Sequence, residues 1–347
     1  MGVFKLILGT PILASTPRPW EFFKVDGIMV NAREILKNNL SYKVRGRGLR
    51  KLLGIDDETE LWVDSGGYQF LLHRDTPSLY KLANLYKSID ADYYISLDYP
   101  PSPSDPLKIR FAKIARTVRN FLRLKDILRC HLEEGRLVPV LHMSAKEPLK
   151  IQLTAYEPHS YTIAVGGLVP YFMQKSGKFS RLKALVFLAL ARKAWRGEIH
   201  ALGTASTAII PLLKKLKIES SDTHTWRHKA AYGKIIVPTI GERHISTRAI
   251  KFGPAFLTKN DEKEAVKIHL AKLLENTEIN MTLNDLENSF EARATFNAWA
   301  LKQVATDGFN YSGLSKPFAK LYETADKLLK YSKSDLEEIL VKLLGLR

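Results

Sequence analysis

The sequence predicts an α/β protein, a (β/α)8 TIM barrel with a mainly helical C-terminal appendage. Eight short β-prone runs lie in about the first 230 of the 347 residues, and each is followed by a loop rich in Gly, Pro, Ser or Asp and then by a helical pattern. Alternating β and α units are typical of parallel sheets, and eight of them favour a barrel over an open sheet. The runs cover residues 4–8, 27–31, 61–65, 93–98, 137–142, 161–166, 199–203 and 218–222.

The spacing of apolar residues predicts helices between these runs, among them residues 78–89 and the apolar-rich segment 181–195. After about residue 235 the pattern changes. Residues 235–240 and 248–252 are expected to be strands or irregular connections that close the barrel.

We predict a barrel domain of residues 1–255 and a helical C-terminal region of residues 256–347. This region is expected to contain helices at 261–275, 283–304 and 319–344, with a linker at 314–317.

Composition limits the class of protein. A chain of 347 residues with 45% hydrophobic content can bury a large core. No run of about 18 uncharged apolar residues occurs, and the first residues look like a strand and not a signal peptide, so we expect a cytoplasmic protein without a membrane span. Cys130 is the only cysteine, which excludes intrachain disulfides and a zinc site built from several cysteines.

The formal net charge is +17. Such an excess of Lys and Arg favours polyanionic partners, of which nucleic acid is the first candidate. The alternative is a basic, heat-tolerant surface without a specific partner.

One stretch combines several features of a site. The β-prone residues 61–63 lead into Asp64-Ser65-Gly66-Gly67-Tyr68-Gln69, which places Asp64 at the carboxyl end of a strand. Sites in barrels are built at these ends. The two glycines allow a ligand to approach the backbone closely, and Tyr68 offers a flat ring for stacking. The alternative is an ordinary turn in which Asp64 caps the next helix.

Polar residues or glycines end nearly every predicted strand, and in a barrel they surround one mouth. Three of them are carboxylates. A purely structural role does not easily explain three carboxylates at one mouth, so we expect an enzyme. These residues are Asn31, Asp64, Asp98, His142, Gly166, Gly167, Gly203, Thr204 and Asp222.

Six segments, in order along the chain, resemble motifs of the tRNA-guanine transglycosylase superfamily, which includes queuine and archaeosine tRNA-ribosyltransferases. Asp64-Ser-Gly-Gly-Tyr-Gln69 resembles the signature D-S-G-G-[FY]-Q. The resemblance extends over about residues 1–240. The other segments are Leu97-Asp98-Tyr-Pro100 (L-D-x-P), Val138-Pro-Val-Leu-His142 (P-V-x-Q, with His142 in place of glutamine), Ala164-Val-Gly-Gly-Leu-Val-Pro170 (A-I-G-G-L), His200-Ala-Leu-Gly-Thr204 (H-x-x-G) and Ser220-Ser-Asp-Thr223 (F-D-S).

The resemblance implies a glycosyltransferase, more narrowly a pentosyltransferase, that exchanges guanine in a nucleic acid for a free, preQ0-like 7-deazaguanine. It implies that Asp222 attacks C1′ and forms a covalent glycosyl intermediate, and that Asp64 is the general acid and base. Asp98 would accept hydrogen bonds from the base, and the target nucleotide would have to flip out of its stack.

The same resemblance implies roles for further residues. Ser65, Gln69, Gly166, Gly167 and Leu168 would line the base pocket, and Tyr68 and Leu202 would sandwich the base. Asn31 would lie near the ribose. His142 is a candidate pocket residue, and Arg227 and Lys229 are candidates for contact with backbone phosphates. Homodimers are common among relatives.

The chain departs from the family in two ways. The tRNA enzymes hold zinc through Cys-x-Cys-x-x-Cys…His, and this chain lacks those cysteines, so no cofactor is expected. Archaeal tRNA enzymes also carry additional C-terminal RNA-binding domains, for which residues 256–347 are too few. A related branch inserts 7-deazaguanines into DNA, in restriction-avoiding modification systems or viruses. The segment Ser220-Ser-Asp-Thr-His-Thr-Trp226 looks closer to that branch, so we favour DNA modification over tRNA modification.

Alternatives remain at each level. The chain could be a tRNA enzyme, a non-catalytic paralogue that binds nucleic acid or supports a partner subunit, or a lyase acting on small molecules. Asp98 could stabilise a turn, Asp222 could cap a helix and His142 could be a core histidine. His224 and His228 could share a helix face, where contact with phosphate or solvent is favoured over metal binding.

Overall fold

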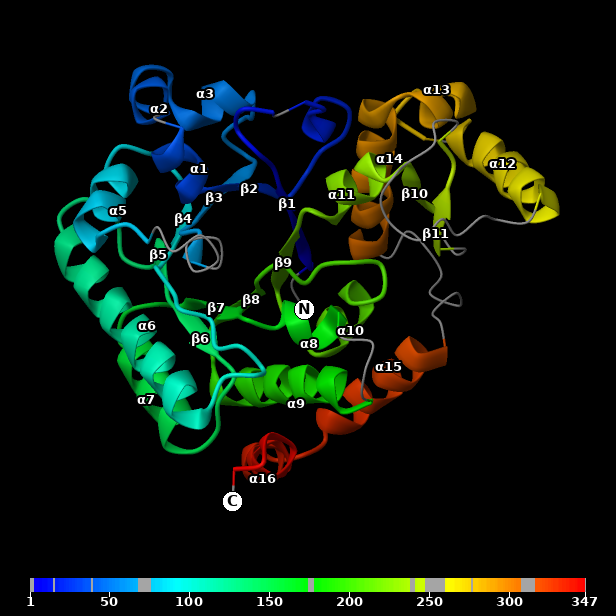
Figure 1. Cartoon of the computed structure of the whole chain (residues 1–347). Coiled ribbons are helices and arrows are strands. Elements are labelled where there is room, and N and C mark those ends of the chain that lie inside the picture. Colours follow the sequence, from blue (N-terminus) through cyan, green and yellow to red (C-terminus); the bar gives the residue numbers. More distant parts are fainter. Residues whose placement is uncertain are drawn as a thin grey trace.

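The computed structural model describes residues 3–14, 16–38, 40–67, 76–173, 178–237, 241–246, 260–275, 277–306 and 316–346. Figure 1 shows the strands of a barrel at the centre of the molecule and helices outside them. The predicted fold class is confirmed.

The barrel is a single parallel sheet, which among the described residues has nine strands in the order β5-β4-β3-β2-β1-β9-β8-β7-β6. β5 and β6 are two halves of one strand position, because only Pro139 lies between them and proline has no N–H to donate. The Pro139 carbonyl still accepts from Ala164 N at 2.9 Å, which links this position to β7. The ring therefore closes with eight strand positions. The strands are β1 Lys5–Gly9, β2 Gly27–Asn31, β3 Glu60–Asp64, β4 Tyr93–Ile95, β5 Leu137–Val138, β6 Val140–His142, β7 Thr162–Gly166, β8 Glu198–Ala201 and β9 Ser220–Thr223.

The alternation of side chains along each strand creates two cores. In β1, Ile7 points into the barrel, whereas Leu6 and Leu8 belong to the core between strands and helices. The interior core is filled by bulky apolar side chains, so the barrel is solid and its site must lie at a mouth. The interior residues are Ile7, Met29, Trp62, Ile95, Val138, Val140 and Ala164, with Tyr93 and Leu202 packed partly buried against them.

Helices cover the outside of the sheet, and β1 is joined to β2 by the short 3-10 helix η1 (Pro19–Glu21). The predicted helices at 78–89 and 181–195 are confirmed as α5 and α9. Ser78 begins α5 by accepting from Lys81 N at 3.2 Å. The helices of this part are α1 Ala32–Lys37, α2 Ser41–Arg47, α3 Leu49–Leu53, α5 Leu79–Tyr86, α6 Leu107–Leu128, α7 Glu147–Tyr156, α8 Val169–Met173, α9 Lys178–Ala194, α10 Ile210–Lys215 and α11 Thr225–Ala231.

The expectation that residues 235–240 help to close the barrel is wrong. β10 (Lys234–Val237) pairs with β11 (Gly241–His244) in a separate antiparallel sheet, because the eight preceding strand positions already close the ring. The predicted strand at 248–252 lies outside the described residues.

The C-terminal region is helical, as predicted, but two of the expected helices are each divided. Ser289 is extended and separates α13 from α14, and the Ser332–Asp335 capping box starts α16 after α15 has ended. The predicted linker at 314–317 overlaps the beginning of α15, and its first two residues lie outside the described part. The helices are α12 Asn260–Leu274, α13 Leu283–Asn288, α14 Phe290–Thr306, α15 Lys316–Leu328 and α16 Lys333–Leu344.

α14 packs against the barrel, where it contacts β1, α11 and η1. Asn297 connects it to its neighbours, since Nδ2 donates to the carbonyls of Trp226 and Lys234 and Oδ1 accepts from Ile236 N at 2.7 Å. Lys302 also forms an ion pair with Asp26. The division at residue 255 stays a prediction, but α14 is bound as closely as the helices that precede it.

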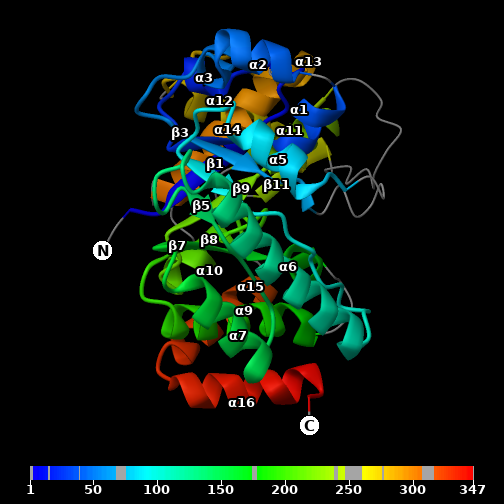
Figure 2. The same ribbon diagram turned by 90° about the vertical axis from the view of Figure 1, so that its left-hand side faces the viewer.

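Figure 2 shows α1, α2 and α3 at one end of the molecule and α16 at the other, as Figure 1 does. None of the described helices combines the length and the apolar character that crossing a membrane requires.

Candidate active site

Polar side chains gather at the carboxyl ends of β2 and β3. Asn31 and Asp64 are paired in the sheet register, and Asn31 Nδ2 donates to Asp64 Oδ2 at 2.9 Å. Asn31 Oδ1 accepts from Arg33 N at 2.9 Å and so caps α1. Because one end of its amide is held by the helix, the other end is fixed towards the carboxylate.

Asp64 is a proton-holding carboxyl group. Its pKa is raised from 3.8 to about 7, first because burial removes water from the charged form and then because Asp98 and Asp222 bring negative charge close to it. Backbone N–H groups of Ser65 and Gly66 oppose this shift without cancelling it. Near neutral pH, Asp64 can therefore both release and take up a proton.

Asp222 has the opposite behaviour. Burial alone would raise its pKa, but a hydrogen bond from His200, the charge of His200, the Gly203 N–H and the charge of His224 together lower it below the ordinary value. Gly203 N donates to Asp222 Oδ1 at 2.6 Å, and His200 Nε2 lies 3.1 Å from the same oxygen. Asp222 is therefore ionised at neutral pH although it is only 5% exposed.

His200 is held from both sides inside the barrel. Its Nδ1 lies 2.9 Å from Ser220 Oγ, and its ring stacks on Trp62 with 4.6 Å between ring centroids. The side chain is fully buried. A proton on Nε2 allows His200 to donate to Asp222 Oδ1.

Asp98 and His142 form a second polar group at the mouth. His142 Nε2 lies 3.2 Å from Asp98 Oδ2, at an angle that does not make a hydrogen bond. Neither ring nitrogen of the fully buried His142 has a hydrogen-bond partner among the described residues. Gln152 holds the backbone instead, since Gln152 Oε1 accepts from His142 N at 2.9 Å. A buried imidazole that has no hydrogen-bond partner among the described residues and lies beside a carboxylate is a candidate contact for a polar ligand.

Glycines pack closely against this pair. A Cβ atom on Gly67 would lie 2.1 Å from Asp98 Oδ1, and one on Gly166 would lie 3.1 Å from His142 Cε1 and 3.4 Å from Asp98 Oδ2. Gly167 has a φ of 74°, which favours glycine, and faces His142 Nδ1. A side chain would clash at Gly67 and Gly166, and at Gly167 the backbone conformation disfavours one.

The remaining predicted pocket residues differ in their positions. Ser65 is fully buried, and its hydroxyl has no hydrogen-bond partner among the described residues. Leu202 packs partly buried against the barrel interior, whereas Leu168 belongs to the core outside the strands. Tyr68 and Gln69 lie outside the described residues, so their roles stay predictions.

The two predicted phosphate contacts also differ. Arg227 Nη1 donates to the Thr16 carbonyl at 2.6 Å, and its guanidinium lies 5.3 Å from the Trp226 ring. Lys229 instead forms an ion pair with Glu242 of β11 at 2.7 Å. Arg227 lines a cavity, described next, and Lys229 is not among its lining residues.

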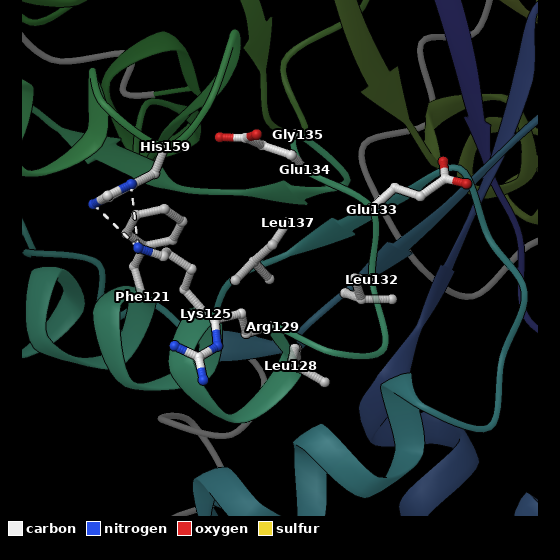
Figure 3. Close-up of a pocket in the computed structure, with 10 residues that line it drawn as sticks. All are labelled: Phe121, Lys125, Leu128, Arg129, Leu132, Glu133, Glu134, Gly135, Leu137 and His159. Atoms are coloured by element: carbon white, nitrogen blue, oxygen red, sulfur yellow. Dashed lines mark hydrogen bonds between the residues drawn. The ribbon is translucent and has the colours of Figure 1, made fainter.

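This cavity, of about 470 Å³, adjoins the carboxylates and shares Asn31 with them. Another cavity, of about 310 Å³, is shown in Figure 3; the end of α6, His159 and the loop that leads into β5 line it. Lys125 Nζ lies 3.2 Å from His159 Nδ1 there. That cavity lies at the amino end of β5, opposite the carboxyl ends where the carboxylates gather.

His200 belongs to one of the sequence motifs but was not among the predicted site residues. The alternation in β8 carried a signal, because His200 is an inward position paired with Ser220 of β9, the strand that contains Asp222. Arg33 and Lys37, which line the cavity beside Asn31, were also missed. Among the described residues, no group of three or more His, Cys, Asp or Glu side chains is arranged to hold a metal ion.

No protein-family model matches the chain. The chain is 26% identical over 251 residues to "Uncharacterized protein 306" of Sulfolobus islandicus rod-shaped virus 1, and the match covers 71% of each chain.

Proposed function

We propose that this protein is a guanine transglycosylase that exchanges guanine in a nucleic acid, with DNA favoured over tRNA, for a 7-deazaguanine base. The observation that carries the proposal is the opposite ionisation of two carboxyl groups at one mouth: the pKa of Asp64 is raised to about 7 and that of Asp222 is lowered. Paired carboxyl groups with pKa values driven apart divide the work of an acid–base catalyst and a nucleophile.

In this mechanism the ionised Asp222 attacks C1′ of the target nucleotide. The bond between C1′ and N9 of guanine breaks, a bond between C1′ and a carboxylate oxygen forms, and the leaving guanine takes the proton of Asp64. The incoming base then gives its N9 proton to Asp64 and displaces Asp222 from C1′. Retaining glycosidases divide the same two steps between two carboxyl groups, and here no co-reactant is needed because the second base replaces the first.

The pair Asp98–His142 supports recognition of the base. The Asp98 carboxylate can accept from the ring N–H and the exocyclic amine of guanine, two donors that lie side by side. His142 has two ring nitrogens without a hydrogen-bond partner among the described residues, and the glycines at 67 and 166 let the backbone approach this pair closely.

Two observations favour a nucleic-acid substrate, and DNA in particular. The net charge of +17 favours a polyanion. The similar protein comes from a virus, and the DNA branch of the superfamily that the sequence resembles occurs in viruses.

A base-exchange assay tests the proposal. Radiolabelled guanine is offered with duplex DNA and, in parallel, with unmodified tRNA, to the natural protein, to Asp222→Ala and to the control Asp57→Asn, which changes an exposed aspartate in the turn before β3. We expect label to enter DNA with the natural protein and the control but not with Asp222→Ala. Label in tRNA alone would make the chain a tRNA enzyme. Label in neither polymer would refute transglycosylation and favour a non-catalytic nucleic-acid-binding protein.

A further inference from the structure

The helix α6 carries a large excess of positive charge. Its 22 residues include seven Lys and Arg residues and one acidic residue, Asp126. No residue of its first turn is acidic, although the dipole of a helix favours negative charge there, and Lys108 lies in that turn. The distribution opposes the stability of the helix itself, which is typical of residues kept for a function.

Four of these basic residues form a row on the outer face of α6, which lies on the outside of the barrel (Figure 1). The opposite face is apolar, and Phe121 and Leu124 are fully buried there. With about 3.6 residues per turn, the four positions fall within about 80° of the helix circumference and span about 22 Å of its axis. The members of this outer basic row, all exposed, are Lys108, Arg116, Arg119 and Arg123.

The outer basic row keeps its charge. Among the residues that the structure describes, Lys108, Arg119 and Arg123 have neither an ion pair nor a side-chain hydrogen bond. The described ion pair of α6 joins Lys113 to Asp105 at 2.7 Å and does not involve the row. The row is therefore a line of cations open to solvent, for which an extended polyanion is the complementary partner.

The helix is anchored beside Asp98 at the mouth of the barrel. Thr117 Oγ1 accepts from Tyr99 N at 2.9 Å, and Asn120 Nδ2 donates to the Leu97 carbonyl at 3.0 Å. The order of these contacts shows that α6 runs opposite to residues 97–99. Its first ten residues therefore extend beyond Tyr99 on the side of the mouth, by up to about 15 Å.

The row leads from the mouth to the outside of the barrel. Arg116 is level with the anchor, and its guanidinium lies 3.9 Å from the centroid of the Tyr99 ring, a contact that orients the cation without neutralising it. Lys108 belongs to the part of α6 that projects beyond the anchor, and Arg119 and Arg123 follow along the flank of the barrel. A polyanion with one unit in the mouth can run along this row with the units next to it.

We propose that the outer basic row of α6 binds backbone phosphates of duplex DNA next to the target nucleotide. The inference rests on the proposed function, which brings one nucleotide of the DNA to the carboxylates at the mouth. Each phosphate that Lys or Arg neutralises releases counterions, so the row contributes affinity that is independent of base sequence and weakens with salt. The four cations position the DNA and take no part in making or breaking bonds.

Salt dependence of binding tests the surface independently of the exchange reaction. All proteins carry Asp222→Asn, so that no exchange occurs, and the affinity for a fluorescent duplex oligonucleotide is measured by anisotropy between about 50 and 200 mM KCl. Arg119→Gln/Arg123→Gln is compared with Lys333→Gln/Lys342→Gln, which removes two exposed charges from α16 and gives the same net charge. We expect the slope of log K against log salt to fall by about 0.9 for each phosphate that the α6 variant no longer neutralises, and to stay unchanged in the control.

Equal slopes in these two double variants would overturn the surface and leave the exchange reaction standing. Arg119→Lys/Arg123→Lys keeps both charges and should keep the slope of the parent protein, which separates the loss of charge from a change of packing. A slope that falls with tRNA but not with duplex DNA would overturn the assignment to DNA.

A second measurement uses the active protein. With Asp222 intact, Arg119→Gln/Arg123→Gln should raise the KM for DNA severalfold and leave kcat and the KM for free guanine unchanged, because the row contacts only the polymer. An unchanged KM for DNA would overturn the proposal. A smaller salt slope for DNA, in a protein that never exchanges guanine, would support the surface and refute the transglycosylase.

Discussion

The change Asp64→Asn removes a carboxyl group whose pKa is raised by burial and by the nearby carboxylates of Asp98 and Asp222. The asparagine keeps the size of the side chain, and its carbonyl oxygen can still accept from Asn31 Nδ2, whose bond to Asp64 measures 2.9 Å. What the variant loses is the ability to carry either a charge or an exchangeable proton. We expect exchange activity to be lost and stability at high pH to increase.

The magnitude follows from the pKa. The folded-state pKa of Asp64 lies above its ordinary value, at about 7 instead of 3.8, so the native protein binds this proton more tightly than the unfolded chain does. Unfolding free energy is therefore lost as pH rises from about 4 to about 7, up to about 4 kcal/mol at about 1.4 kcal/mol per pH unit. Between pH 5 and pH 8 the natural protein should lose about 2–3 kcal/mol that Asp64→Asn keeps.

Urea denaturation at a series of pH values between 5 and 8 measures this difference. Asp57→Asn, in the loop that precedes the same strand, is the control for the loss of one negative charge. The curves of unfolding free energy against pH should diverge for Asp64→Asn and run parallel for Asp57→Asn. Parallel curves for both variants would mean that Asp64 ionises like an exposed aspartate. It could not then supply a proton near neutral pH, and the proposed acid–base role would be wrong.

Three further changes test the other groups of the site. His200→Gln removes the imidazole beside Asp222, so the pKa of Asp222 should rise and the acid limb of the pH profile of kcat/KM should move to higher pH. An unmoved limb would mean that His200 does not lower the pKa of Asp222. Gly67→Ala places a Cβ where Asp98 Oδ1 lies, and overpacking of about 1–3 kcal/mol should raise KM for the free base about tenfold or more, with little change in KM for the nucleic acid. Asp98→Asn replaces a charged acceptor and should raise the KM for guanine by about tenfold to a hundredfold, whereas an unchanged KM would place the base elsewhere.

Much of the fold could be predicted from local pattern, because each strand of a parallel barrel is a short β-prone run with a turn at its end. The break at Pro139 did not hide the fifth strand, since the run on both sides of it is apolar. The part of the chain after the barrel was harder to predict. Residues 235–240 look like another barrel strand, and only the closure of the ring by earlier strands, a long-range property, sends β10 into its own hairpin.

The candidate site was predictable to the extent that it consists of strand ends. Asn31, Asp64 and Asp98 all follow β-prone runs, and the structure brings them to one mouth. The cations of the cavity were not predictable in the same way, because Arg33 and Lys37 meet Arg227 only when α1 and α11 lie on neighbouring parts of the ring. In a chain with an excess of Lys and Arg, single basic residues carry little information.

The pKa values of Asp64 and Asp222 are shifted in opposite directions because the two residues have different neighbours in the sheet. β8 and β9 are aligned so that His200 pairs with Ser220, and its ring reaches Asp222, the next inward position on β9. Asp64 has the neutral amide of Asn31 as its partner in register and two carboxylates nearby. Sheet register thus gives one carboxyl group a stabilising imidazole and leaves the other with like charges. Under the proposed function, this difference suits Asp222 to act as the nucleophile and Asp64 to carry the proton.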